Sequence, residues 1–106
     1  MSSNLGEKIK TLRKDKKLTL EKLADLAGLS KSYLWELENR ESQKPSAEKL
    51  SSLADALGVS MNYFIDQNSL EPKEEHLDEA FFRGYQQLDS GSKEQLRKIL
   101  DAFKKE

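Results

Sequence analysis

The chain has 106 residues, of which 36% are hydrophobic and 35% charged, and its formal net charge is −1. A chain of this length forms one small domain, or one domain with an appendage. It has no apolar run long enough to cross a membrane, no apolar segment typical of a secretion signal, and no cysteine. We therefore expect a cytoplasmic protein without disulfides or thiolate metal sites.

The charge is unevenly distributed along the chain. Residues 1–66 hold 11 Lys and Arg against 10 Asp and Glu, and residues 67–106 hold 7 against 9. The first 17 residues contain six of the cations: Lys8, Lys10, Arg13, Lys14, Lys16 and Lys17. Such a cluster can contact nucleic-acid phosphates, but the total charge is too low for a non-specific nucleic-acid coat. Any binding should depend more on fit than on bulk charge.

Apolar residues recur at helical spacing along residues 1–66, and no stretch has the alternation of a strand. This spacing predicts helices over 5–16, 20–27, 31–39, 47–57 and 61–65. Four Ser or Thr residues stand at predicted helix starts as N-caps: Thr19, Ser30, Ser46 and Ser60. Gly28 and Gly58 stand where two of the helices should end. We expect residues 1–66 to form one all-α domain.

The remaining residues should form a linker and a helical hairpin. Residues 67–75 are polar, acidic and broken by Pro72, so they are predicted to be the linker. Residues 76–106 hold two amphipathic helices joined by a turn at 89–92, with Ser92 as the expected cap of the second helix. Helices of about 12 residues are marginal alone in water, so the two must pack on each other and on something else.

The apolar faces of this hairpin are candidates for a dimer or partner contact. Their residues are Leu77, Phe81, Phe82, Tyr85, Leu88, Leu96, Ile99, Leu100 and Phe103. The alternative is that they extend the core within one chain. Phe82 points away from the stripe that Phe81 shares, which favours an intermolecular contact.

The second and third predicted helices, with the tight turn at 28–30 between them, form a helix-turn-helix. Leu34 and Leu37 of the third helix should face the core. The exposed side of this helix is then formed by Lys31, Ser32, Trp35, Glu36 and Asn39. Its first turn would reach base edges in the major groove of DNA. The face pattern alone leaves two alternatives open, namely ordinary solvated side chains and a Trp35 ring folded over a neighbouring loop.

Residues 5–66 resemble the Cro/repressor-type helix-turn-helix family, also called the XRE family. The likeness is carried by the stretches GEKIKTLRKDKKLTLEKLADLAGLSKSYLWELENR and PSAEKLSSLADALGVSMNYF, which follow the family pattern through all five helices. The resemblance implies a lambda-repressor-like five-helix domain that binds double-stranded DNA.

The resemblance also implies roles for individual residues. The positions that match base readers, with Trp35 standing between them, are Lys31, Ser32 and Glu36. Positions that match contacts with the DNA backbone are Tyr33, Arg40 and Lys44, to which we add Lys17 from the basic cluster and Asn39 from the exposed face. Arg13 and Glu38 match a partly buried ion pair that joins the first helix to the third.

One position departs from the family pattern. The family commonly has Gln as the first residue of the second helix, where it contacts phosphate, and this chain has Leu20. Leu20 and Trp35 could instead meet thymine methyl groups or a protein surface.

The sequence offers little for catalysis. Its only histidine, His76, stands among acidic residues at the end of the linker, and we expect it to be solvated rather than a metal ligand. There is no glycine-rich phosphate loop and no arrangement typical of a catalytic triad. We therefore expect a non-enzyme without a cofactor or a metal.

Family members usually bind near-palindromic operators as two-fold dimers. The leading prediction is a homodimeric transcriptional repressor. One alternative is the antitoxin or partner-sensing half of a two-protein module, whose 76–106 hairpin binds a toxin or a regulatory protease. A third is a helix-turn-helix domain used only for assembly.

Overall fold

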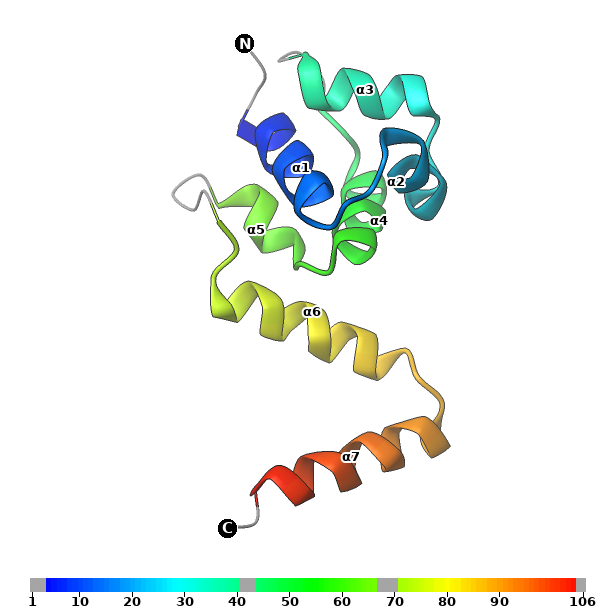
Figure 1. Cartoon of the computed structure of the whole chain (residues 1–106), viewed down its shortest axis with the longest axis vertical. Coiled ribbons are helices and arrows are strands. Elements are labelled where there is room, and N and C mark those ends of the chain that lie inside the picture. The colour runs from blue at the N-terminus through cyan, green and yellow to red at the C-terminus, as the bar shows by residue number, and fades with distance from the viewer. Residues whose placement is uncertain (1–3, 41–43, 67–70, 105–106) are drawn as a thin grey trace.

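The computed structural model describes residues 4–40, 44–66 and 71–104. Within these ranges the chain forms seven helices and no strand. The helices are α1 (Asn4–Asp15), α2 (Leu20–Ala27), α3 (Lys31–Asn39), α4 (Ala47–Leu57), α5 (Met61–Ile65), α6 (Glu74–Gln86) and α7 (Ser90–Lys104). The first five gather into one body, and α6 and α7 extend from it in turn (Figure 1).

Local sequence sets most of the helix ends. Thr19, Ser30 and Ser46 each accept, through the side-chain oxygen, the backbone N–H three residues further on, at 3.0–3.2 Å. Gly28 and Gly58 end α2 and α4 with φ of 69° and 72°, a backbone conformation that glycine adopts without steric cost. These caps confirm the sequence-based prediction for α2, α3 and α4.

A single hydrophobic core joins α1 to α5. Its buried residues all lie between positions 9 and 64: Ile9, Leu12, Leu23, Ala24, Ala27, Leu34, Leu37, Leu53, Ala54, Leu57, Val59, Tyr63 and Phe64. Leu5 and Leu50 pack against this core while remaining half-buried. Ile65, by contrast, is 61% exposed, so the last residue of α5 points away from the core.

Gly6 allows α1 to pack closely against α3. A Cβ atom built on Gly6 would lie 2.6 Å from the carbonyl oxygen of Leu37 and 2.7 Å from that of Glu38. Both atoms belong to the backbone, so neither can move aside cheaply. Only glycine fits this helix contact.

Lys8 is buried, although the sequence places it in the basic cluster. Only 3% of Lys8 is exposed, and its Nζ donates to the carbonyl oxygens of Tyr63, at 2.6 Å, and of Asp66. Burial lowers the pKa of the Lys8 ammonium, and the Asp66 carboxylate partly opposes this effect. The expectation that the whole cluster can contact phosphates is therefore wrong for Lys8, which joins α1 to α5.

The helix α6 begins two residues before the predicted start of the hairpin at residue 76 and is docked on the five-helix body. His76 is 2% exposed, its Nδ1 accepts the Lys73 N–H at 2.9 Å, and its ring centroid lies 5.4 Å from that of Tyr63. The prediction of a solvated His76 is wrong. The first turn of α6 directs this ring onto α5, while its acidic neighbours remain exposed.

Two polar contacts further along α6 complete the docking. Glu79 accepts hydrogen bonds from Ser60 Oγ at 3.1 Å and from Asn62 Nδ2 at 3.0 Å. Ser60 therefore makes no side-chain cap for α5, in contrast to the prediction. Arg83 Nε donates to Asp55 Oδ1 at 2.8 Å, which ties the helix to α4.

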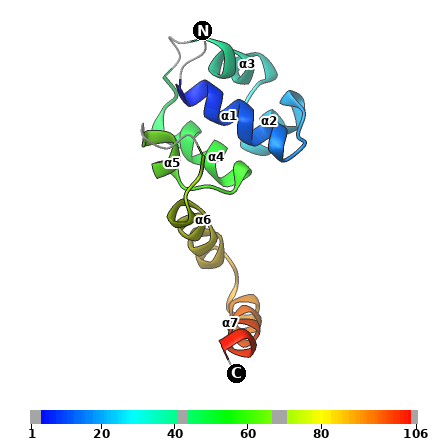
Figure 2. The ribbon, with the colours of Figure 1, turned by 60° about the vertical axis from the view of Figure 1, so that its left-hand side comes forward.

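The last two helices are joined by a short turn, as predicted, and diverge from it in a V (Figure 1). Turned by 60°, the two helices follow one another away from the five-helix body (Figure 2). Asp89 Oδ1 accepts the Ser92 N–H at 2.7 Å, so Asp89 caps α7 in place of the predicted Ser92. No described residue of α7 is buried. The expectation that the two helices pack on each other is therefore not met within one chain. The radius of gyration of 15.6 Å exceeds the roughly 13 Å of a globular domain of this length because the V projects outward.

Candidate nucleic-acid interface

The angle between α2 and α3 is set by the residues of the turn. Gly28 takes a left-handed conformation, the Leu29 N–H donates to the Ala24 carbonyl at 2.8 Å, and Ser30 caps α3. Leu29 packs against the core. Together these contacts hold the two helices in a helix-turn-helix, with α3 on the outer surface of the body (Figure 1).

An ion pair fixes α3 against α1. Arg13 Nε donates to Glu38 Oε2 at 2.7 Å, and Arg13 Nη2 donates to Oε1 at 3.0 Å. The remaining guanidinium nitrogen donates to the Leu18 carbonyl at 3.0 Å, and Glu38 is only 1% exposed. A bidentate pair of this kind defines orientation as well as distance. It holds the opposite face of α3 outward.

The outward face brings the four predicted base-reading residues together. Lys31, Ser32, Trp35 and Glu36 line one hollow of about 270 Å³, and Leu20 of α2 completes its wall. Lys31 and Ser32 are exposed and Glu36 is half-buried. The hollow therefore lies between the first turn of α3 and Leu20, the residue that stands where the family commonly has Gln.

Trp35 lies on the open side of α3. Its side chain is 46% exposed, the Arg40 guanidinium lies 5.7 Å from its ring centroid, and Asn39 Nδ2 donates to its carbonyl at 2.8 Å. Asn39 is the last residue of α3, and Arg40 is the position directly after it. The ring thus stays largely open to solvent, with Arg40 beside it.

The residues predicted to contact the DNA backbone occupy varied environments. Lys17, Arg40 and Lys44 are exposed, whereas Asn39 and Tyr33 are half-buried. Lys17 follows α1 with φ of 58°, so it also shapes the end of that helix. Lys49 Nζ lies 4.3 Å from the centroid of the Tyr33 ring. Lys49 was not predicted to lie here, because its proximity to Tyr33 depends on the tertiary arrangement of α3 and α4.

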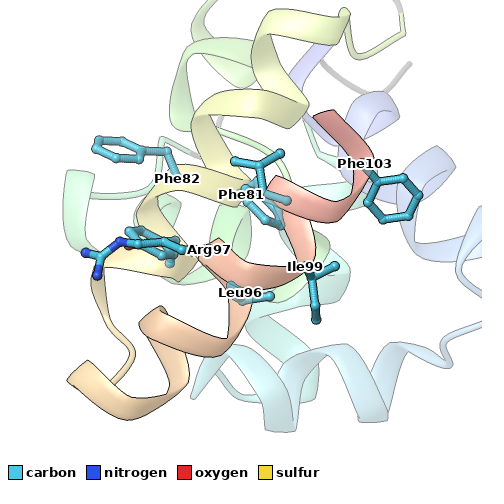
Figure 3. Close-up of a pocket in the computed structure, with 8 residues that line it drawn as sticks. Phe81, Phe82, Leu96, Arg97, Ile99 and Phe103 are labelled. Carbon is cyan, nitrogen blue, oxygen red and sulfur yellow. The ribbon is translucent and has the colours of Figure 1, made fainter. Parts of the chain in front are cut away.

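A second surface feature is the apolar groove between α6 and α7 (Figure 3). It has a volume of about 470 Å³ and is lined by Phe81, Phe82, Tyr85, Leu96, Arg97, Ile99, Leu100 and Phe103. Seven of the predicted contact residues lie in it, while Leu77 and Leu88 lie outside. Arg97 was not predicted, and its guanidinium lies 5.7 Å from the Tyr85 ring centroid.

Neither a metal-binding group nor a membrane-spanning helix occurs among the described residues. Among residues 4–40, 44–66 and 71–104, no group of three or more His, Cys, Asp or Glu is placed to hold a metal ion. In the same part of the chain, no helix has the length and apolar character needed to span a membrane.

A helix-turn-helix that presents polar side chains from the first turn of its second helix, within a five-helix body, defines a class of DNA-binding regulators. The helix-turn-helix family matches residues 9–64, which is more than half of the chain. The protein belongs to this family, in its XRE-type branch, whose members are DNA-binding transcriptional regulators.

Two regulators, one from a phage and one from a bacterium, are similar to this protein over nearly the whole chain. The immunity repressor protein of Bacillus phage phi105 is 34% identical over 98 residues, which is 92% of this chain and 65% of the phage protein. The transcriptional regulator SinR of Bacillus subtilis strain 168 is 33% identical over 99 residues, which is 92% of this chain and 89% of SinR.

Solved structures of SinR share the fold. SinR in complex with DNA matches with a TM-score of 0.56 and 37% identity, over 58% of this chain and 98% of that one. The complex of SinR with SinI matches with a TM-score of 0.58 and 29% identity, over 94% of each chain. The first likeness covers little more than half of this chain, and the second covers nearly all of it.

Proposed function

We propose that this protein is a sequence-specific transcriptional repressor that binds double-stranded DNA as a homodimer and reads the major groove with α3. The observation that carries the proposal is the outward face of α3, where Lys31, Ser32, Trp35 and Glu36 surround one hollow. The likeness to an immunity repressor and to a regulator solved with DNA supports it. An inserted α3 would occupy the promoter and exclude the transcription machinery.

The proposed base contacts follow from hydrogen-bonding capacity. The Lys31 ammonium can donate to guanine O6 and N7, the Glu36 carboxylate can accept from cytosine N4, and the Ser32 hydroxyl can pair with several bases. The first turn of α3 adds the positive end of its dipole, which favours a phosphate close by. Arg13 and Glu38 act indirectly by holding the helix at the angle that these contacts need.

The proposed backbone contacts surround this face. Cations can neutralise phosphates, while the amide and phenol groups can donate to phosphate oxygens. The residues are Lys17, Tyr33, Asn39, Arg40 and Lys44. Since they carry no base information, their loss should weaken binding to every sequence alike and reduce its salt dependence.

The proposed dimer forms through the α6–α7 groove. A two-fold contact presents the same surface from both copies, so the apolar residues exposed in one chain become buried by the other. Because α6 is docked on the DNA-binding body through His76, Glu79 and Arg83, such a dimer would hold two copies of α3 at a defined separation. Operator half-sites are then expected about 34 Å apart, one turn of DNA.

The same groove is the proposed site for a protein partner. SinR, whose fold this chain shares, has been solved in complex with SinI. The similarity to repressors favours regulation of transcription over the antitoxin alternative. We infer that the protein acts by binding alone, without catalysis, cofactor or metal, and that it works in the cytoplasm.

The test is DNA binding by the full chain at about 0.15 M salt, comparing the upstream region of its own gene with a shuffled duplex. We expect preferential binding of the upstream duplex, quenching of Trp35 fluorescence, and two chains per duplex. Because each lost base contact costs about 1–3 kcal/mol, the double variant Lys31→Ala with Glu36→Ala should bind more than tenfold more weakly and lose sequence preference.

The matched control is Lys98→Ala, which removes one exposed cation on α7, far from α3. It should leave the preference for the upstream duplex intact. Equal binding of the upstream and shuffled duplexes by the unmodified protein would contradict the proposal.

A further inference from the structure

The hollow on the DNA-facing side has apolar walls and a polar rim. Leu20, the first residue of α2, and Trp35, in the middle of α3, supply the apolar groups. Lys31 and Ser32, from the first turn of α3, supply the polar rim together with Glu36. At about 270 Å³ the hollow admits part of a base but not a folded partner.

The surroundings of Trp35 favour DNA over protein as the occupant. Within the described part of α1 to α5, the exposed large hydrophobic residues are Leu26, Trp35 and Ile65, one on each of three helices. A stable protein interface buries about 800 Å² on each side around an apolar centre, and a single aromatic residue does not provide such a centre. Trp35 instead lies between the cations Lys31 and Arg40, whose charges complement phosphate.

The position of Leu20 excludes the usual phosphate contact of this helix end. Leu20 is half-buried and packs in part against the core, and the rest of its side chain lines the hollow. Because an aliphatic side chain has no donor to offer, that exposed part can make only an apolar contact. The one apolar group that a base pair presents in the major groove is the C5-methyl group of thymine. The Trp35 indole, with the Arg40 guanidinium 5.7 Å from its ring centroid, forms the second wall of the same hollow.

We propose that Leu20 and Trp35 together bind a thymine C5-methyl group and so determine which base the protein accepts at one position of each half-site. The inference rests on the proposed function, since it needs α3 in the major groove. It makes two apolar side chains specificity-determining residues, beside the polar contacts of Lys31 and Glu36.

The test uses deoxyuridine, which lacks only the thymine methyl group. The full chain first selects its preferred duplexes from a random 20-bp library. Each dT of the selected duplex is then replaced by dU, and affinity is measured by anisotropy of a fluorescein-labelled duplex, so that no readout depends on Trp35. Burial of one methyl group contributes about fourfold in affinity, or ~0.8 kcal/mol. At one dT position, replacement in both half-sites should therefore weaken binding about 15-fold, since the two losses multiply.

Variants assign this preference to the hollow. In Trp35→Ala and in Leu20→Ala, the ratio of dT to dU affinity at that position should fall to less than about threefold, since a wall of the methyl site is gone. Leu26→Ala is the matched control, because Leu26 is an exposed leucine of the same helix that does not line the hollow. Its dT to dU ratio should equal that of the unmodified protein.

The inference and the proposed function fail in different ways. An enriched sequence bound equally well with dT and dU at every position would overturn the methyl site and leave the repressor standing. Full discrimination in both variants would also overturn it. Selection that enriches no sequence would overturn the proposed function and the inference with it.

Discussion

At the scale of single residues, Gly6 shows how strongly one position can depend on a distant one. We expect Gly6→Ala to lower the free energy of unfolding by about 1–3 kcal/mol, because the added methyl overlaps the α3 backbone. Urea denaturation measures the change. Gly84→Ala is the control, since the same atom on α6 meets open space and alanine favours a helix by up to about 1 kcal/mol. Equal effects of the two substitutions would contradict this account of the α1–α3 contact.

The cations in and directly after the first helix separate into groups that their sequence does not distinguish. Lys8 is buried against α5, Arg13 is paired with Glu38, and Lys14 and Lys17 are exposed. All four lie within ten positions of one another. Helical periodicity assigns each to a face, but the partner of Lys8 lies 55 residues away and follows only from the packing of α5. Single-residue roles were therefore predictable where a family pattern named the partner, and not elsewhere.

At the scale of elements, α6 is the helix whose role the sequence described least well. It reads as the start of a separate hairpin, yet it contacts both α4 and α5 through its buried histidine and two polar contacts. Exposed ion pairs such as Arg83 with Asp55 contribute little on their own. The buried His76 ring should therefore account for most of the docking.

We expect His76→Ala to release α6 from the body. Amide hydrogen exchange in α6 should become about 10- to 100-fold faster, because the substitution removes the Tyr63 contact and the acceptor for the Lys73 N–H. Exchange in α1 to α4 should stay unchanged. Asp78→Ala, an exposed position of the same helix, is the control and should leave α6 protected. Unaltered exchange in the His76 variant would show that other contacts hold the helix.

The helix ends show the same division. Thr19, Ser30 and Ser46 cap their helices as predicted because a cap needs only the backbone three residues on. Ser60 has the same local setting but donates to Glu79, 19 residues away. Asp89 replaces Ser92 as the cap of α7. Here the residue that caps the helix is only three positions from the predicted one, and the sequence analysis placed it in the turn.

At the scale of the whole molecule, exposed apolar surface is concentrated at one end. Of the ten large hydrophobic residues exposed in the described chain, six lie on α6 and α7, and a seventh, Leu88, lies in the turn between them. Such a concentration is typical of an interaction surface. Phe103 is 82% exposed and lines the groove. A charge placed there would be costly to bury.

We therefore expect Phe103→Glu to convert a dimer into a monomer, as measured by sedimentation equilibrium. Affinity for a duplex with two half-sites should fall as well. In a dimer, binding of one α3 holds the second α3 close to the other half-site, which raises the overall affinity. Lys98→Ala, also on α7 and 75% exposed, should remain dimeric. A Phe103→Glu protein that sediments as a dimer would place the interface elsewhere.

The sequence alone determined the helices, most of their caps, the five-helix body and the outward face of α3. These features depend on periodicity and on contacts within a few residues, which a linear pattern records. Only the tertiary structure decided that Lys8 is buried, that His76 docks α6, that α6 and α7 diverge, and that Leu20 meets Trp35 in one hollow. Each of these depends on how helices pack across long separations in the chain, and packing geometry is set by the shapes of both surfaces rather than by the residues of either one.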